Sequence, residues 1–168
     1  MEIKEISSIQ GYESSLNLLL TDAIESGASV GFLTPVDQRD IESYWTTVNA
    51  ELDPDSRRLF VAVDQGNVAG TVQLSICTKP NGSHRGEVEK LMVHTRYRGL
   101  GLSKRLMALM ESSASAAGLS LLVLDTRFGD IASSLYRSLG YTEAGTIPQF
   151  ARSSSGELEA TVYFYKQL

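Results

Sequence analysis

The chain has 168 residues, of which 42% are hydrophobic and 21% are charged, and its formal net charge is −5 at pH 7. This composition predicts one folded domain over residues 1–168, and the acidic balance argues against a nucleic-acid partner. The single cysteine, Cys77, excludes an intrachain disulfide and a multi-cysteine zinc site, and with only two histidines we expect no metal. Apolar runs too short to cross a bilayer and an N-terminus without an apolar signal core predict no membrane partner and a cytoplasmic location.

The first fifty residues predict a short strand followed by two helices. The strand falls within residues 1–9, and Tyr12–Ser26 carries apolar residues at the spacing of one buried helical face. A second helix is expected from about Pro35 to Ala50, with Thr34 as its cap and the proline in its first turn.

The middle of the chain predicts an antiparallel meander of three strands, Leu59–Val63, Val68–Ile76 and Glu87–Val93. Strict alternation in the third strand would place its side chains on two faces. One face would hold Glu87, Glu89, Leu91 and Val93, and the other Val88, Lys90 and Met92.

The C-terminal part predicts a helix from about Gly101 to Ala117, a strand at Leu119–Asp125 buried on both faces, a short helix at Ile131–Leu139 and a last strand at Thr161–Tyr165. The apolar side of the long helix would carry Leu102, Leu106, Leu109, Met110, Ser113 and Ala117. This order implies a βαβ unit with parallel strands. We therefore expect an α/β (α+β) fold with a mixed, mostly antiparallel sheet flanked by helices.

The turn between the third strand and the long helix carries a pattern suited to binding an anion. Gly99 and Gly101 lack a β-carbon, the helix that follows presents free first-turn amides, and Arg96 and Arg98 add positive charge. The turn matches neither of two other phosphate-binding motifs. A Walker loop has its lysine before the serine or threonine, whereas here Lys104 follows Ser103. A dinucleotide-binding fingerprint needs a third glycine at position 104, where this chain has the lysine.

The pattern Arg96-x-x-Gly99-x-Gly101 resembles the acetyl-CoA loop of the GCN5-related N-acetyltransferase (GNAT) superfamily. A second signature of that family, a short helix with a tyrosine and then Gly-Tyr, is matched at Ala132–Tyr141. Gly129 replaces the asparagine of many relatives, so no asparagine contact is expected. Within the superfamily the chain is most similar to the tabtoxin-resistance acetyltransferases, in Gly27–Phe32, Lys79–Gly82, Lys90–Val93 and the segment from Gly140 onward.

The resemblance implies acetyl-CoA as cosubstrate and transfer of its acetyl group to a primary amine of a small molecule. The backbone of Leu91, Met92 and Val93 would pair with the pantetheine arm. The diphosphate would be held by Arg98, Gly99, Leu100, Gly101, Leu102 and Ser103. Tyr136 would act as general acid, and Glu87 or Asp125 as general base.

Structural alternatives stay open for each of these side chains. Tyr136 can be a core residue, Glu87 and Glu89 ordinary strand residues, and Asp125 the cap of a turn. Cys77 fits a small buried position, His84 and His94 fit the surface, and Phe32, Tyr44 and Trp45 fit either the core or a substrate pocket. Acetylation of a protein or peptide and a non-catalytic acyl-CoA-binding domain are the alternative functions. A homodimer stays open as the oligomeric state.

Overall fold

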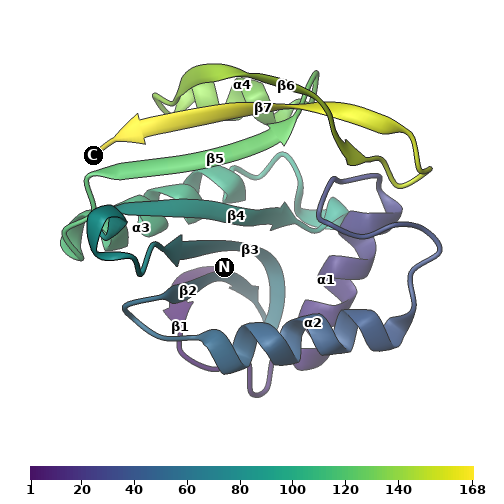
Figure 1. Cartoon of the computed structure of the whole chain (residues 1–168). Coiled ribbons are helices and arrows are strands. Elements are labelled where there is room, and N and C mark those ends of the chain that lie inside the picture. The colour runs from purple at the N-terminus through teal and green to yellow at the C-terminus, as the bar shows by residue number, and fades with distance from the viewer.

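The computed structural model describes residues 1–168 and contains a seven-stranded sheet with four α-helices (Figure 1). The strands are β1 Glu2–Ile6, β2 Arg57–Asp64, β3 Asn67–Ile76, β4 Arg85–Val93, β5 Leu121–Arg127, β6 Thr142–Arg152 and β7 Leu158–Gln167. The helices are α1 Glu13–Glu25, α2 Gln38–Glu51, α3 Leu102–Ala116 and α4 Ala132–Ser138. The sheet order is β1-β2-β3-β4-β5-β7-β6, and only the pair β4 and β5 is parallel. The predicted fold class and its βαβ unit are confirmed.

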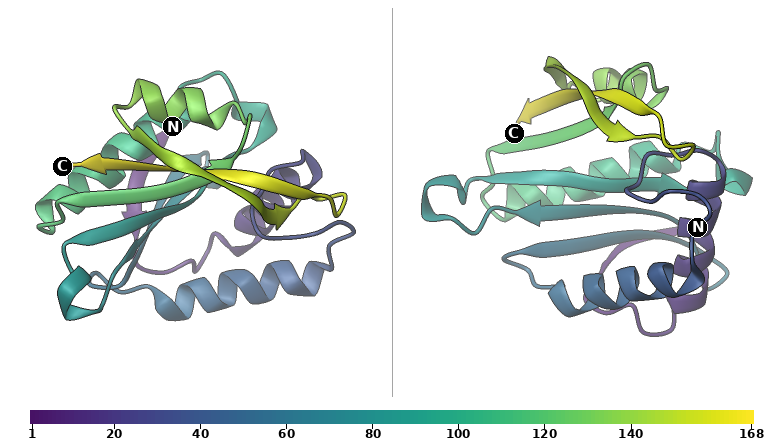
Figure 2. Two further views of the ribbon diagram at one scale, coloured as in Figure 1. Left: turned by 45° about the horizontal axis from the view of Figure 1, so that its top comes forward. Right: turned by 45° about the vertical axis from the view of Figure 1, so that its right-hand side comes forward.

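Helices cover both faces of the sheet (Figure 2), and an apolar core lies between the helices and the sheet on each side. On one face α1 and α2 pack on β2 and β3 through residues such as Leu19, Trp45 and Val61. On the other face α3 and α4 pack on the centre of the sheet through residues such as Leu106 and Phe164. Each helix buries one stripe of apolar side chains, so the sheet is enclosed on both sides.

The start of α2 differs from the prediction. The helix begins at Gln38 rather than near Pro35, because the carboxylate of Asp37 caps it by accepting a hydrogen bond from the amide of Arg39 at 2.8 Å. Thr34, the predicted cap, instead donates its hydroxyl to the carbonyl oxygen of Ser154 at 2.7 Å.

The C-terminal elements require three further corrections. The buried face of α3 includes Met107 and Ala114, whereas Ala117 is exposed. In β5 only Leu122 and Leu124 are buried, since the other face of the strand borders a cavity. Strand β6 was not predicted, and all of its residues are exposed, so it carries no alternation of buried and exposed positions.

A bulge in β4 overturns the predicted alternation of that strand. Thr71 pairs with Met92 and Gln73 with Glu89, so two residues of β4 lie opposite Val72 alone. One of the two, Lys90, has a φ of 51°. Beyond the bulge the faces are exchanged: Leu91 and Val93 join Val88 in the core beneath α3, whereas Met92 joins the opposite core.

Strands β4 and β5 separate soon after they pair. Their register runs only from Arg85 opposite Leu121 to Glu87 opposite Val123, after which no further pairs form. The second half of β4 therefore has an unpaired edge toward β5. None of the helices has the length and apolar character needed to cross a membrane.

Candidate active site

Two neighbouring cavities meet where β4 and β5 separate. The loop-side cavity, of about 650 Å³, is bordered by Leu91–Val93, the loop before α3, the first turn of α3 and α4. The carboxylate-side cavity, of about 390 Å³, is bordered by residues 28–31, β4, β5 and the β6–β7 hairpin. The two cavities adjoin, because six of their lining residues are shared: Ala28, Leu91, Arg127, Asp130, Ala132 and Tyr136. A molecule in one cavity can thus reach a molecule in the other.

The loop before α3 is shaped to receive an anion at the loop-side cavity. Gly99 and Gly101 have φ angles of 78° and 73°, a backbone conformation that glycine adopts without strain. No side chain caps α3, and its first backbone bond runs from the amide of Arg105 to the carbonyl of Gly101, which leaves the amides of residues 102–104 without an acceptor in the chain. The positive end of the helix dipole lies at the same place.

Hydrogen bonds to Asp22 of α1 and to Ser26, which directly follows that helix, hold this loop in place. The carboxylate of Asp22 accepts from the amide and the hydroxyl of Thr95 at 2.8 and 2.7 Å. The guanidinium of Arg98 donates to the hydroxyl of Ser26 at 2.9 Å. Arg98, which the family resemblance assigns to the diphosphate, therefore lines the loop-side cavity from a fixed position.

Tyr136 lies at the junction of the two cavities and also belongs to the core. Its side chain is buried, and its ring lies with its centroid 5.9 Å from those of Tyr141 and Phe164. No group of the protein forms a hydrogen bond with its hydroxyl, and protein atoms do not enclose this hydroxyl completely. Burial raises the pKa of Tyr136 to about 12, so the hydroxyl keeps its proton at neutral pH.

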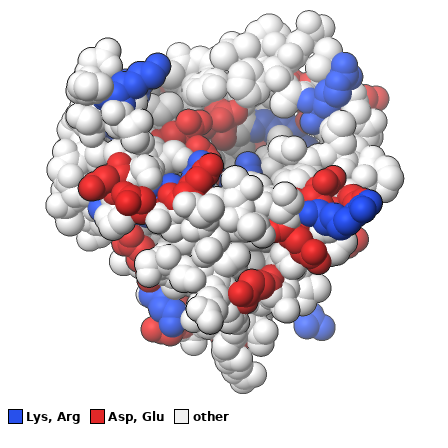
Figure 3. All heavy atoms as spheres, turned by 60° about the horizontal axis from the view of Figure 1, so that its bottom comes forward, with Lys and Arg blue, Asp and Glu red and all other residues white.

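The two predicted base candidates face the carboxylate-side cavity from adjacent strands. Glu87 is the last residue of β4 that pairs with β5, and Asp125 stands two residues beyond its partner Val123. Glu87 is exposed at the mouth of the cavity, and partial loss of its hydration there, followed by the neighbouring carboxylates Glu89 and Asp125, raises its pKa. Asp125 accepts a hydrogen bond from the hydroxyl of Thr161 at 2.7 Å. From the side of α2, acidic and basic side chains lie together in and around a hollow of the surface (Figure 3).

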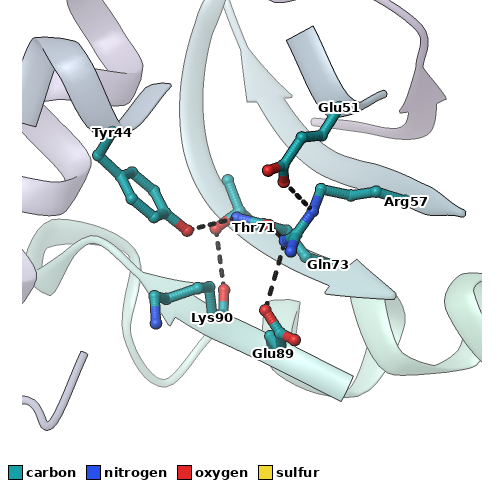
Figure 4. A network of polar contacts seen from close by, with 7 residues as sticks. All are labelled: Tyr44, Glu51, Arg57, Thr71, Gln73, Glu89 and Lys90. Atoms are coloured by element: carbon teal, nitrogen blue, oxygen red, sulfur yellow. Dashed lines mark hydrogen bonds and ion pairs between the residues drawn. The ribbon is translucent and has the colours of Figure 1, made fainter. Parts of the chain in front are cut away.

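A polar network beside Glu89 was not predicted (Figure 4). Gln73 is fully buried; its oxygen accepts from Arg57 at 2.6 Å and its nitrogen donates to the hydroxyl of Tyr44 at 2.8 Å. Arg57 also pairs with Glu89 at 3.3 Å and with Glu51 at 2.9 Å. The network fixes Glu89 at the rim of the cavity, and no local sequence pattern signals it, because its members come from distant segments.

The remaining candidates lie outside the two cavities. Trp45 is a core residue whose indole nitrogen donates to the carbonyl of Leu16 at 3.0 Å, and Phe32 packs edge-on against Tyr44. Cys77 is half-buried and borders a separate hollow beside Ala117. His84 is exposed, whereas His94, expected at the surface, is half-buried because its imidazole accepts from the amide of Arg96 and packs against Tyr97.

Residues 20–141 match the model of the acetyltransferase (GNAT) family. An uncharacterized N-acetyltransferase of Azospirillum brasilense is 32% identical over 111 residues, which cover 63% of this chain and 62% of that protein. The chain therefore spans less than two thirds of the length of this relative.

Solved structures share the fold along the whole chain. A ribosomal-protein-alanine N-acetyltransferase from Brucella melitensis superimposes with a TM-score of 0.79 at 23% identity, covering 100% of both chains. A candidate acetyltransferase from Salmonella typhimurium, solved with its cofactor acetyl-CoA, gives a TM-score of 0.78 at 18% identity, covering 100% of this chain and 95% of that one.

Proposed function

The chain belongs to the acetyltransferase (GNAT) family, and on that premise we propose that it transfers the acetyl group of acetyl-CoA to the primary amine of a small molecule. The observation that carries the proposal is the junction of the two cavities at Tyr136. One cavity has the free amides and arginine that suit a diphosphate, and the other has the carboxylates that suit an ammonium group.

The loop-side cavity fits acetyl-CoA in three respects. The amides of Leu102 and Ser103, together with Gly99, Leu100, Gly101 and Arg98, would hold the diphosphate. The unpaired edge of β4 at Leu91, Met92 and Val93 offers backbone donors and acceptors to the amide groups of the pantetheine arm, as an added strand would. The cavity then leads to Tyr136, where the thioester would lie.

Acetyl-CoA supplies an activated acyl group, so that a new C–N bond forms at the amine nitrogen as the C–S bond breaks. The acceptor is mostly ammonium at neutral pH and must lose a proton before it attacks. Glu87 or Asp125 would accept this proton, directly or through water. Tyr136, which keeps its proton at neutral pH, would donate to the departing sulfur.

The carboxylate-side cavity supports a small acceptor. Its volume of about 390 Å³ suits an amino-acid-sized molecule, and five of its lining residues are acidic. We infer a positively charged amine of this size, and an amino-acid-like toxin of the tabtoxin type remains the most specific candidate that the sequence resemblance provides. One domain over residues 1–168, a homodimer and a cytoplasmic location also stay predictions.

The direct test combines binding and turnover. Calorimetry should detect acetyl-CoA binding to the folded protein, and free coenzyme A should appear when a panel of small amines is added. Release with peptides alone would instead assign a protein or peptide acceptor, and binding without release from any amine would assign a non-catalytic acyl-CoA-binding role. Absence of binding at millimolar acetyl-CoA would overturn the proposal.

A further inference from the structure

The carboxylate-side cavity contains one cation with no hydrogen-bonding or ionic partner, Lys90. Its ammonium group forms no hydrogen bond or ion pair within the chain, although it lies among acidic residues. The other cation of the cavity, Arg127, is already engaged: it donates to the carbonyl of Gly27 at 3.1 Å and lies 3.7 Å from Asp130 and 3.6 Å from Glu159. Lys90 is thus the one positive group in this cavity that is free to take a ligand.

The fold aims Lys90 into this position. The bulge turns Glu89 and Lys90 in different directions, so that Glu89 points toward Arg57 while Lys90 points toward Tyr44 (Figure 4). The Nζ atom lies 5.9 Å from the centre of the Tyr44 ring and 3.7 Å from the place where a β-carbon on Gly31 would stand. An aromatic ring and the loop at residues 28–31 therefore shield it.

A shielded ammonium gains more from a counter-ion than an exposed one does. Burial lowers the pKa of Lys90, while Glu89, Asp125 and Glu87 act in the opposite direction. A carboxylate that reached Nζ would compensate for the lost hydration and form a charge-assisted hydrogen bond.

We propose that Lys90 binds a carboxylate of the acceptor molecule, so that the acceptor is a small amino acid whose amine faces Glu87 and Asp125. The inference rests on the proposed acetyl transfer and extends it to the class of substrate. Glu87 and Lys90 project from the same strand three residues apart, which places a proton acceptor and an anion-binding group on one wall of the cavity.

The experiment compares matched acceptors. Coenzyme A release is measured with a series of small amino acids and with the corresponding carboxamides, which keep the amine but lose the negative charge. The wild-type protein should prefer the acids, and Lys90→Gln should lose this preference through a rise in the KM for the acids of about 10-fold or more. Lys90→Arg should retain part of it, and Lys79→Gln, at an exposed lysine, should retain all of it.

Three outcomes would overturn the inference. The first is equal release from acids and carboxamides by the wild-type protein, and the second is an unchanged preference in Lys90→Gln. The third is acetylation of Lys90 itself in protein incubated with acetyl-CoA alone, detected by mass spectrometry. Binding of acetyl-CoA without release from any amine would instead contradict the proposed transfer on which the inference rests. Thermal melting of each variant separates a lost contact from a lost fold.

Discussion

At the scale of single residues, the hydroxyl of Tyr136 is the group whose role can be tested most cleanly. Phenylalanine keeps the ring contacts with Tyr141 and Phe164 and removes only the oxygen. We expect Tyr136→Phe to lower kcat by roughly 10²–10⁴-fold, the usual contribution of a general acid, with an unchanged Kd for acetyl-CoA. Assays of coenzyme A release measure kcat, and calorimetry measures the Kd for acetyl-CoA. Tyr12→Phe is the control. Unchanged turnover would leave Tyr136 as a core residue only.

The dependence of kcat/KM on pH tests the role of Glu87 as the base. A base must be ionised to accept a proton, and partial loss of hydration and two neighbouring carboxylates raise the pKa of Glu87. The fall of kcat/KM at low pH should therefore follow this raised pKa. Replacing Glu89 by glutamine removes a negative charge, lowers the pKa of Glu87 and moves the acidic limb to lower pH.

The pH profile also distinguishes the two base candidates. If Glu87 is the base, Glu87→Gln should abolish the acidic limb of the kcat/KM profile. If instead Glu89→Gln leaves this limb in place and Asp125→Asn abolishes it, Asp125 is the base. Glu42→Gln, at an exposed position of α2, should leave the profile unchanged.

At the scale of elements, the bulge in β4 positions the strand edge that faces both cavities. The hydroxyl of Thr71, which is fully buried, donates to the carbonyl of Lys90 at 3.1 Å and so holds the bulge from β3. Thr71→Val keeps the shape of the side chain but removes the donor. We expect a loss of about 1–3 kcal/mol in the free energy of unfolding and a rise in the KM for acetyl-CoA.

The conservative variant separates positioning from simple destabilisation. Thr71→Ser retains the hydroxyl and should restore the KM for acetyl-CoA even if it restores only part of the stability measured by urea unfolding. A raised KM in both variants, in proportion to their stability, would contradict a positioning role for this hydroxyl.

Local patterns predicted the elements that depend on neighbours in sequence. The apolar spacing of α1, the Arg96–Gly101 loop and the tyrosine of α4 are all visible within a few residues. The bulge depends on how β4 pairs with β3, a strand that lies earlier in the chain, so strict alternation placed Leu91 and Lys90 on the wrong faces. The contacts of Gln73 with Tyr44 and Arg57 also join distant segments and leave no periodic signal.

At the scale of the whole molecule, the residues around the loop before α3 are positively charged although the chain as a whole is negatively charged. The chain carries a net charge of −5, yet Arg96, Arg98, Lys104 and Arg105 lie in or near the loop before α3. The net charge disfavours an anionic ligand, whereas these four cations attract one to the loop. The proposed cofactor site thus depends on local electrostatics around one helix terminus.

A substitution in the first turn of α3 can oppose this local field without disturbing the fold. A glutamate at position 103 suits the first turn of α3, because the positive end of the helix dipole favours a negative side chain there. Ser103→Glu should therefore melt at the same temperature as the wild-type protein, or slightly above it, but repel the diphosphate of acetyl-CoA.

Ligand at 100 times its Kd should raise the melting temperature of the wild-type protein by about 5–10 °C. Ser103→Glu should lose most of this shift, whereas Ser112→Glu, exposed on the same helix, should keep it. A full shift in Ser103→Glu would mean that the diphosphate binds elsewhere, because a carboxylate in the first turn cannot share those amides with a second anion.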